Sequence, residues 1–236
     1  MILLICDTGN QKLPESILED RINKPWRPLP TGRLSSLEAR RLQFFLIPIG
    51  ILVVHLCMGH ALQPFVGVLI LTWMYNDLGG SEDHYIIRNL CNAAAFVCFS
   101  TGSTLVASGN DARLTRHGQN WVCMIGLIVV TTIQMQDLPD IDGDAVRGRE
   151  TMPLTAGDTF ARWSVAVPVL CWSFIGPIFW HLPLLAYSPT VFIGGLLSFR
   201  VLAYRQIIAD QKTWKLWCLW IISIYLLPLM GGLTGF

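Results

Sequence analysis

One stretch of the sequence places four aspartates directly after a long apolar run. Residues 136–153 read QDLPDIDGDAVRGRETMP. Asp137, Asp140 and Asp144 have the spacing D-x-x-D-x-x-x-D, which puts three carboxylates on one face of a helix with 3.6 residues per turn. Like charges at this spacing repel one another, so the pattern favours a divalent cation among them, and Mg²⁺ prefers such oxygen ligands. We therefore predict a helix that begins near Leu138 and presents these aspartates to Mg²⁺.

A solvated acidic loop or helix cap is the alternative interpretation of this stretch. The three acids, however, lie against the end of an apolar segment and are followed by Arg147 and Arg149. Guanidinium groups bind phosphate oxygens in a bidentate manner. The combination favours the chemistry of a metal ion with a diphosphate.

A second polar stretch, residues 10–33, reads NQKLPESILEDRINKPWRPLPTGR. Pro14 suits the first turn of a helix. In such a helix Glu15 and Glu19 share a face one turn apart, and Asp20 lies beside them. These acids are the second set of candidate metal ligands.

Three basic residues, Arg21, Lys24 and Arg27, follow these acids at once. Arginine and lysine can bind the oxygens of a phosphate group, arginine as a planar fork and lysine as a point charge. The alternative is an amphipathic loop held by salt bridges between its own acids and bases. We favour acids for a metal beside bases for a phosphate.

Composition places the chain in a lipid bilayer. It is 53% hydrophobic and 14% charged with a mean hydropathy of +0.49, whereas soluble domains carry about 25% charged residues. The net charge of +1 and the lack of a basic stripe interleaved with aromatics give no indication of a nucleic-acid partner. The chain is therefore predicted to be a multi-pass integral membrane protein.

Seven segments approach the length of about 20 apolar residues that a spanning helix needs. They are residues 42–59, 61–75, 86–108, 120–135, 160–180, 182–202 and 214–230. Prolines inside the first and fifth segments predict kinks rather than breaks, because neighbouring helices satisfy the freed carbonyl groups. We expect an all-α bundle of about seven transmembrane helices with short helical caps on one face.

The basic residues predict the orientation of this bundle. Four spans separate the two acidic stretches, so both stretches lie on the same face. All but two of the 17 lysines and arginines fall on that face or at its boundary, the exceptions being Arg113 and Arg116. By the positive-inside rule, this face is predicted to be cytosolic.

Together the two stretches resemble the motifs of the UbiA superfamily of intramembrane prenyltransferases. That family carries N-D-x-x-D-x-x-x-D followed by R-P-L-P-x-G-R, and a second D-x-x-D-x-x-x-D four spans later. Here RPLPTGR occupies residues 27–33, the second motif matches in full, and GRETMP follows at 148–153. The first motif departs, since Asn10 precedes a glutamine and the acid spacing is shifted. This form is similar to a fungal branch that includes membrane-bound terpene cyclases.

The resemblance implies a Mg²⁺-dependent enzyme that ionises a prenyl diphosphate and transfers the prenyl group to an aromatic or other electron-rich acceptor. It implies metal ligands in both motifs: Asn10, Glu15, Glu19, Asp20, Asp137, Asp140 and Asp144, of which the last three are the expected catalytic residues. It implies diphosphate contacts from five bases: Arg21, Lys24, Arg27, Arg147 and Arg149. The allylic cation formed by ionisation would lie in a pocket among the helices.

The family usually has nine spans and places its first motif after the second span, whereas this motif begins near residue 10. We therefore expect residues 1–236 to form one UbiA-like membrane domain that lacks the first span and most of the second. Its seven spans then correspond to family spans three to nine.

Three alternatives to a prenyltransferase stay open. A terpene cyclase acting on farnesyl diphosphate would use the same residues. A shortened, inactive relative could serve as a binding or assembly partner. A transporter is disfavoured because the ionisable residues gather at span ends rather than at the bilayer midplane.

Two other groups of residues have weaker interpretations. In residues 75–89, Asn76 and Asp77 could line a pocket mouth and Arg88 could contact the diphosphate. The favoured interpretation is a simple helix boundary, at which Gly79 and Gly80 end one helix and Glu82 and Asp83 begin the next. Seven aromatic residues are available to stabilise a carbocation, although packing or contact with lipid is the favoured interpretation for each: Trp73, Tyr75, Phe96, Phe99, Trp121, Phe160 and Trp163.

Overall fold

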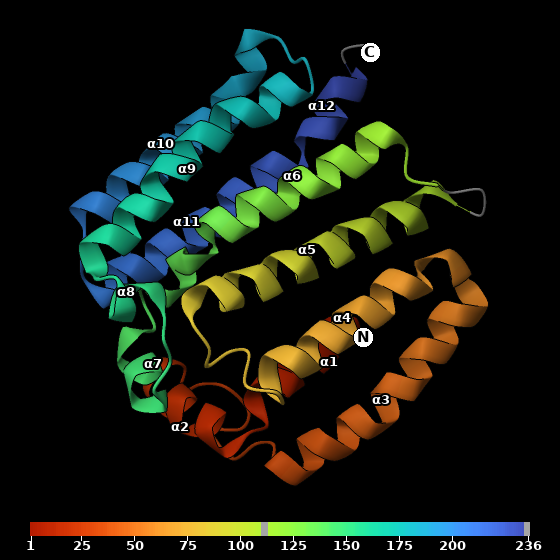
Figure 1. Ribbon diagram of the computed structural model, residues 1–236, viewed down its shortest axis with the longest axis vertical. Helices are drawn as coiled ribbons and strands as arrows, with labels where there is room; N and C mark the ends of the chain where they lie inside the picture. The colour runs from red at the N-terminus through yellow and green to blue at the C-terminus, as the bar shows by residue number, and fades with distance from the viewer. Residues whose placement is uncertain (110–112, 234–236) are drawn as a thin grey trace. The chain divides into compact units, whose positions relative to one another are not determined.

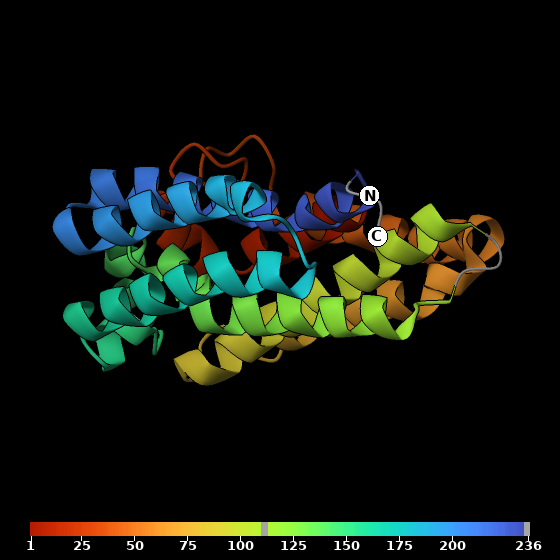
Figure 2. The same ribbon diagram turned by 90° about the horizontal axis from the view of Figure 1, so that it is seen from above.

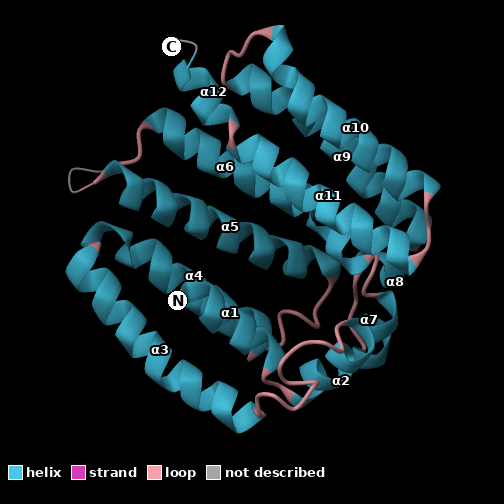
Figure 3. Ribbon diagram, turned by 180° about the vertical axis from the view of Figure 1, so that it is seen from behind, coloured by secondary structure: helices cyan, strands magenta, loops and turns pink. Residues whose placement is uncertain are grey.

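Every regular element in the part of the chain that this computed structural model describes, residues 1–109 and 113–233, is a helix (Figure 3). The chain divides into two compact units, Met1–Val130 with Asp142–Glu150, and Thr131–Ile141 with Thr151–Phe236. The all-α polytopic fold predicted from the sequence is confirmed.

In the first unit, a short N-terminal helix packs against two longer helices, and one of these packs against a third. Helix α1 packs against α3 and α4, and α4 packs against α5 (Figure 1). The helices that contribute to this unit are α1 (Ile2–Gln11), α2 (Pro14–Asn23), α3 (Ser36–Cys57), η1 (Gly59–Ala61), α4 (Leu62–Asn76), α5 (Tyr85–Ser108), α6 (Arg116–Thr132) and α7 (Ile141–Arg147). In Figures 1 and 3, α2, α7 and the loop between α4 and α5 gather at one end of this unit.

Local sequence explains where α2 and α3 begin. Pro14 occupies the first turn of α2, as predicted, because a proline there gives up no hydrogen bond. Ser35 caps α3: its side chain accepts from the backbone N–H of Glu38, and the Glu38 side chain accepts from the N–H of Ser35. This reciprocal capping box satisfies backbone donors at the start of the helix.

Helix α1 is fixed tightly against its neighbours. The amide of Gln43 on α3 donates to the carbonyl of Ile5 at 2.9 Å, and Lys12 donates to the Gln43 side-chain oxygen at 3.0 Å. Gly9 lies where a Cβ atom would come within 3.1 Å of both Gln43 and Thr72. Side chains on α1 are therefore held in fixed positions relative to α3 and α4.

The second unit packs α10 against α9 and α11, and Figure 2 shows these three helices running alongside one another. Its helices are η2 (Ile133–Asp137), α8 (Met152–Thr155), α9 (Asp158–Phe179), η3 (Leu184–Tyr187), α10 (Ser188–Ala203), α11 (Ile207–Tyr225) and α12 (Leu227–Leu233). The buried Arg162 of α9 forms two 2.8 Å bonds to Asp210 of α11 and donates to the Val201 carbonyl of α10. A buried guanidinium satisfied in this way joins the ends of three helices.

Six helical segments in the described residues are long and apolar enough to cross a membrane. They are Ser36–Cys57, Tyr85–Ser108, Arg116–Asp137, Asp158–Phe179, Leu184–Ala203 and Ile207–Gly231. The expected second span corresponds to α4, whose 15 residues fall short of the length needed to cross alone. The helices α3 and α9 continue through their internal prolines, as predicted.

The prediction of a helix beginning near Leu138 is wrong. The 3₁₀-helix η2 ends at Asp137, and α7 begins only at Ile141. Between them the N–H of Asp140 donates to the carbonyl of Asp137 at 3.3 Å, a bond of the 3₁₀ type. Pro139 has no N–H, and its ring would collide with a carbonyl one turn earlier in a continuous α-helix. The three aspartates of the second motif therefore do not share one helical face.

Two adjacent glycines of α10 test the packing of the second unit. A Cβ atom at Gly194 would collide with the Ser173 hydroxyl, which accepts a 2.9 Å hydrogen bond from the indole of Trp220, whereas a Cβ at Gly195 would meet nothing within 4 Å. We expect Gly194→Ala to lower the free energy of unfolding by about 1–3 kcal/mol through overpacking.

The matched control, Gly195→Ala, should leave stability unchanged or raise it by about 0.5–1 kcal/mol, because alanine favours the helix. Denaturant unfolding in detergent micelles measures both variants. Equal effects of the two substitutions would contradict the packing described for α10.

Candidate active site

A single guanidinium joins the two acidic motifs within the first unit. Arg149 lies 3.0 Å from Glu19 of the first motif and 3.1 Å from Asp144 of the second, through its two terminal nitrogens. All three side chains are at most 7% exposed. The carboxylates of Glu19 and Asp144 therefore lie side by side across one buried cation.

The sequence VRGR at the end of α7 places Arg149 in this position. Gly148 has a φ of +73°, a left-handed conformation that glycine adopts without strain. The N–H of Arg149 donates to the carbonyl of Asp144, and the N–H of Gly148 donates to that of Ala145. This pair of bonds is a Schellman motif, which ends the helix and turns the chain back. The turn brings the Arg149 side chain to the Asp144 carboxylate.

Arg147 extends the cluster to two further segments. It donates to Glu19 at 2.9 Å and to Ser16 on α2 at 2.8 Å. On its other side it lies 3.0 Å from Glu82, in the loop between α4 and α5. The Arg147 side chain is only 1% exposed. The sequence suggests only a helix start at Glu82, because a lone acid in a glycine-containing loop carries no signal for a distant arginine.

Close approach of α2 to α7 depends on Gly143 within the second motif. Its N–H donates to the side-chain oxygen of Asn23 at 3.1 Å, and a Cβ at this position would collide with the Asn23 amide. Asn23 is buried at the end of α2. Neither residue was a candidate from the sequence, yet their contact brings Glu19 and Asp144 close to each other.

Asp20 and Arg27 form a separate bidentate pair. Arg27 donates to both carboxylate oxygens of Asp20, at 2.8 and 2.9 Å. Burial raises the pKa of Asp20, and the Arg27 guanidinium opposes that rise by favouring the charged carboxylate. A base predicted to contact phosphate is thus bonded to an acid predicted to contact metal.

The remaining predicted residues fall at different places. Glu15 and Arg21 are exposed on α2, and Lys24 is half-buried just after it. In the second unit, Asp137 is buried at the end of η2 and Asp140 is half-buried in the following turn. Asn10, on α1, lines a cavity.

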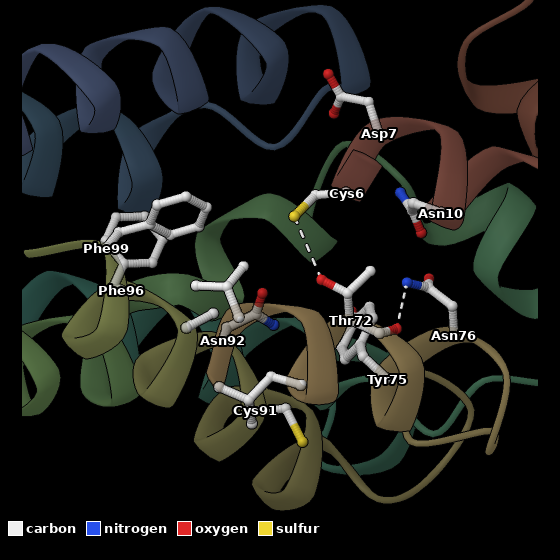
Figure 4. Close-up of a pocket in the computed structure, with 13 residues that line it drawn as sticks. Cys6, Asp7, Asn10, Thr72, Tyr75, Asn76, Cys91, Asn92, Phe96 and Phe99 are labelled. Carbon is white, nitrogen blue, oxygen red and sulfur yellow. Dashed lines mark hydrogen bonds between the residues drawn. The ribbon is translucent and has the colours of Figure 1, made fainter. Parts of the chain in front are cut away.

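This cavity, of about 320 Å³, lies within the first unit among α1, α4 and α5. Asn76 and Thr72 of α4 lie opposite Asn10 in Figure 4, and Phe96 and Phe99 of α5 lie together at the other end. The predicted helix boundary after α4 is confirmed, but Asn76 also belongs to the cavity wall. A cavity with one polar end and one aromatic end can hold an apolar chain that carries a polar head.

The donors available for Mg²⁺ are few. No group of three or more His, Cys, Asp or Glu side chains in the described residues lies close enough to hold a metal ion. Mg²⁺ usually keeps several waters, however, and needs only one or two carboxylates when substrate phosphates complete its shell. Glu19 and Asp144, adjacent across Arg149, fit this smaller requirement.

Comparison with known proteins gives a family and relatives. Residues 16–227 match the UbiA prenyltransferase family. A fumagillin beta-trans-bergamotene synthase of Aspergillus fumigatus is 30% identical over 232 residues, which cover 94% of this chain and 75% of the relative. A somaliensene A/B synthase of Streptomyces somaliensis is 33% identical over 216 residues, which cover 84% of this chain and 66% of the relative. The chain thus spans two thirds to three quarters of the length of these relatives.

A solved structure, described as digeranylgeranylglyceryl phosphate synthase in membranes, shares the fold. It aligns with a TM-score of 0.50 over 96% of this chain and 80% of that chain at 18% identity. The enzyme class expected from the two motifs, a prenyltransferase or terpene cyclase, is confirmed at the level of the family. With nine tenths of its length matched by the family and the two motifs brought together on Arg149, the chain belongs to the UbiA prenyltransferase family.

Proposed function

We propose that the protein is a Mg²⁺-dependent intramembrane enzyme that ionises a prenyl diphosphate and transfers the prenyl group to an aromatic or other electron-rich acceptor. The observation that carries this proposal is the contact of Glu19 and Asp144, one acid from each motif, with Arg149. Two carboxylates and two buried arginines within one cluster supply ligands for a cation and donors for a diphosphate.

The chain's own side chains would exchange partners when a diphosphate binds. Arg147 and Arg149 would turn from Glu19 and Asp144 to the phosphate oxygens, since phosphate accepts the same bidentate bonds as a carboxylate. The released carboxylates would hold Mg²⁺, with Asn10 and Asp20 of the same unit as further candidate ligands. Asp137 and Asp140 remain ligands that the sequence motif predicts. With Mg²⁺ bound, the charge that develops on the leaving pyrophosphate is neutralised.

The cavity beside Asn10 is the proposed site of the prenyl cation. Its polar end includes Asn76, where an acceptor could be hydrogen-bonded, and its other end has the rings of Phe96 and Phe99. Aromatic faces attract cations, and this attraction is stronger where water is excluded.

We place the protein in a membrane with the motif cluster on the cytosolic side, as the distribution of basic residues predicts. The chain acts in this proposal as one catalytic domain, and its partners are the prenyl diphosphate, the acceptor and the bilayer.

Cyclisation is the second candidate function, in which a double bond of the substrate captures the cation. The similarity to a bergamotene synthase over 94% of the chain favours it. The ionisation step and the residues that support it are the same in both reactions.

Substitutions in the second motif test the ionisation step. We expect Asp140→Asn and Asp144→Asn each to lower the rate of pyrophosphate release from a prenyl diphosphate by about 100-fold or more, since even indirect partners of metal ligands are worth about 10–100-fold. Asp142→Asn is the control, because Asp142 is exposed on α7. The assay measures pyrophosphate released by the purified protein with Mg²⁺. Wild-type rates in the Asp140 and Asp144 variants would contradict the proposed role of the motif.

Farnesyl diphosphate without an added acceptor separates transfer from cyclisation. A transferase should release little product without an acceptor and form a prenylated aromatic compound when one is supplied, because the cation needs a second molecule. Gas chromatography of the headspace detects a volatile hydrocarbon, and its formation would instead establish the cyclase. Failure to release pyrophosphate from prenyl diphosphates of any chain length, with or without acceptor, would favour a non-catalytic relative.

A further inference from the structure

We propose that Asp7 is the base that removes the proton which the product must lose after the prenyl cation has been captured. This inference rests on the proposed function and adds a residue outside both acidic motifs. Asp7 is the only carboxylate among the 13 residues that line the cavity in the described part of the first unit. It lies one helical turn before Asn10, where the first motif begins.

The position of Asp7 relative to the cavity is fixed by the residues around it. The thiol of Cys6 is 3.3 Å from the Thr72 hydroxyl of α4, and the carbonyl of Ile5 accepts from Gln43 of α3. These two contacts join α1 to α4 and to α3 just before Asp7. Asp7 is therefore held at the edge of the cavity.

The chemistry of the cavity leaves one residue suited to accept this proton. Figure 4 shows the carboxylate of Asp7 beyond Cys6 at the edge of the group, with Phe96 and Phe99 at the opposite end. The other polar residues that line the cavity are asparagines, cysteines, a threonine and a tyrosine, which are weaker bases than a carboxylate. A carboxylate at the edge of a cavity whose other lining residues are uncharged is placed to accept a proton released there.

Both candidate reactions require such a base. In transfer, an electron pair of the acceptor forms the bond to the prenyl carbon as pyrophosphate leaves with the electrons of the broken C–O bond. The resulting adduct is positively charged and must lose a proton. The proton moves to Asp7, and the electrons of the broken C–H or O–H bond stay with the product. In cyclisation, the C–H electrons next to the final cation form a double bond, and the proton moves to the same carboxylate. Asp7 is exposed, so it can pass the proton to solvent and be ready for the next turnover.

The test compares Asp7→Asn with the wild-type protein through two readouts, pyrophosphate release and the identity of the prenyl product. We expect Asp7→Asn to release pyrophosphate at the wild-type rate, because the motif cluster is intact. Formation of the deprotonated product should fall by about 10²–10⁴-fold, the usual contribution of a general base. Prenyl alcohol, formed when water captures the cation, should take its place. Asp142→Asn serves as the carboxylate control.

A second variant, Asp7→Ala, separates loss of a base from loss of structure. Added acetate or formate should restore part of the deprotonated product in Asp7→Ala, because this variant lacks the base and leaves room for an external one. It should restore none in Asp144→Asn, because that variant is impaired in the ionisation step. An unchanged unfolding temperature confirms that both Asp7 variants are folded.

The outcomes separate this inference from the proposed function. Wild-type product at the wild-type rate in Asp7→Asn, with pyrophosphate release intact, would overturn the role of Asp7 alone. Loss of pyrophosphate release in folded Asp7→Asn would also overturn it, since Asp7 would then act in ionisation. Absence of pyrophosphate release by the wild-type protein would contradict the proposed function, and the inference about Asp7 would fall with it.

Discussion

The contact of Glu19 and Asp144 with one buried guanidinium is the interaction on which the first unit's polar end depends. Two carboxylates this close repel each other strongly where water is scarce, and removal of one partner from a buried ion pair costs about 3–5 kcal/mol. Arg149 compensates both charges and Arg147 adds a second cation beside Glu19. Helix α2, helix α7 and the loop between α4 and α5 meet here because their charges balance.

This balance suits a site that binds a highly charged substrate. In the absence of a diphosphate, the acids and arginines satisfy one another, so the cluster avoids the large cost of buried unpaired charge. A metal diphosphate brings both a cation and an anion, and each can replace an internal partner of the same sign. In the proposed exchange, the number of contacts between opposite charges would stay similar, which would keep the free-energy cost of separating the internal ion pairs low.

The sequence was informative about local features and less so about contacts between distant segments. Apolar length predicted the spans except for the short second segment, and Pro14 predicted the start of α2, because both depend on neighbouring residues. The helix predicted to begin near Leu138 begins instead at Ile141, because Pro139 separates η2 from α7. No spacing rule reveals that Arg147 meets Glu19, 128 residues away along the chain. Asp7 was overlooked because a lone acid beside an apolar run gives no periodic signal, and only the cavity shows its significance.

The measurement that tests the central claim most directly is the binding of an unreactive farnesyl thiodiphosphate analogue, by calorimetry with and without Mg²⁺. If Glu19 and Asp144 serve one cation, Glu19→Gln and Asp144→Asn should each weaken Mg²⁺-dependent binding by about 10–100-fold. The double variant should then bind about as well as either single variant, because residues that share one partner are not additive. Tight binding that is independent of Mg²⁺, or losses that simply add, would contradict the account.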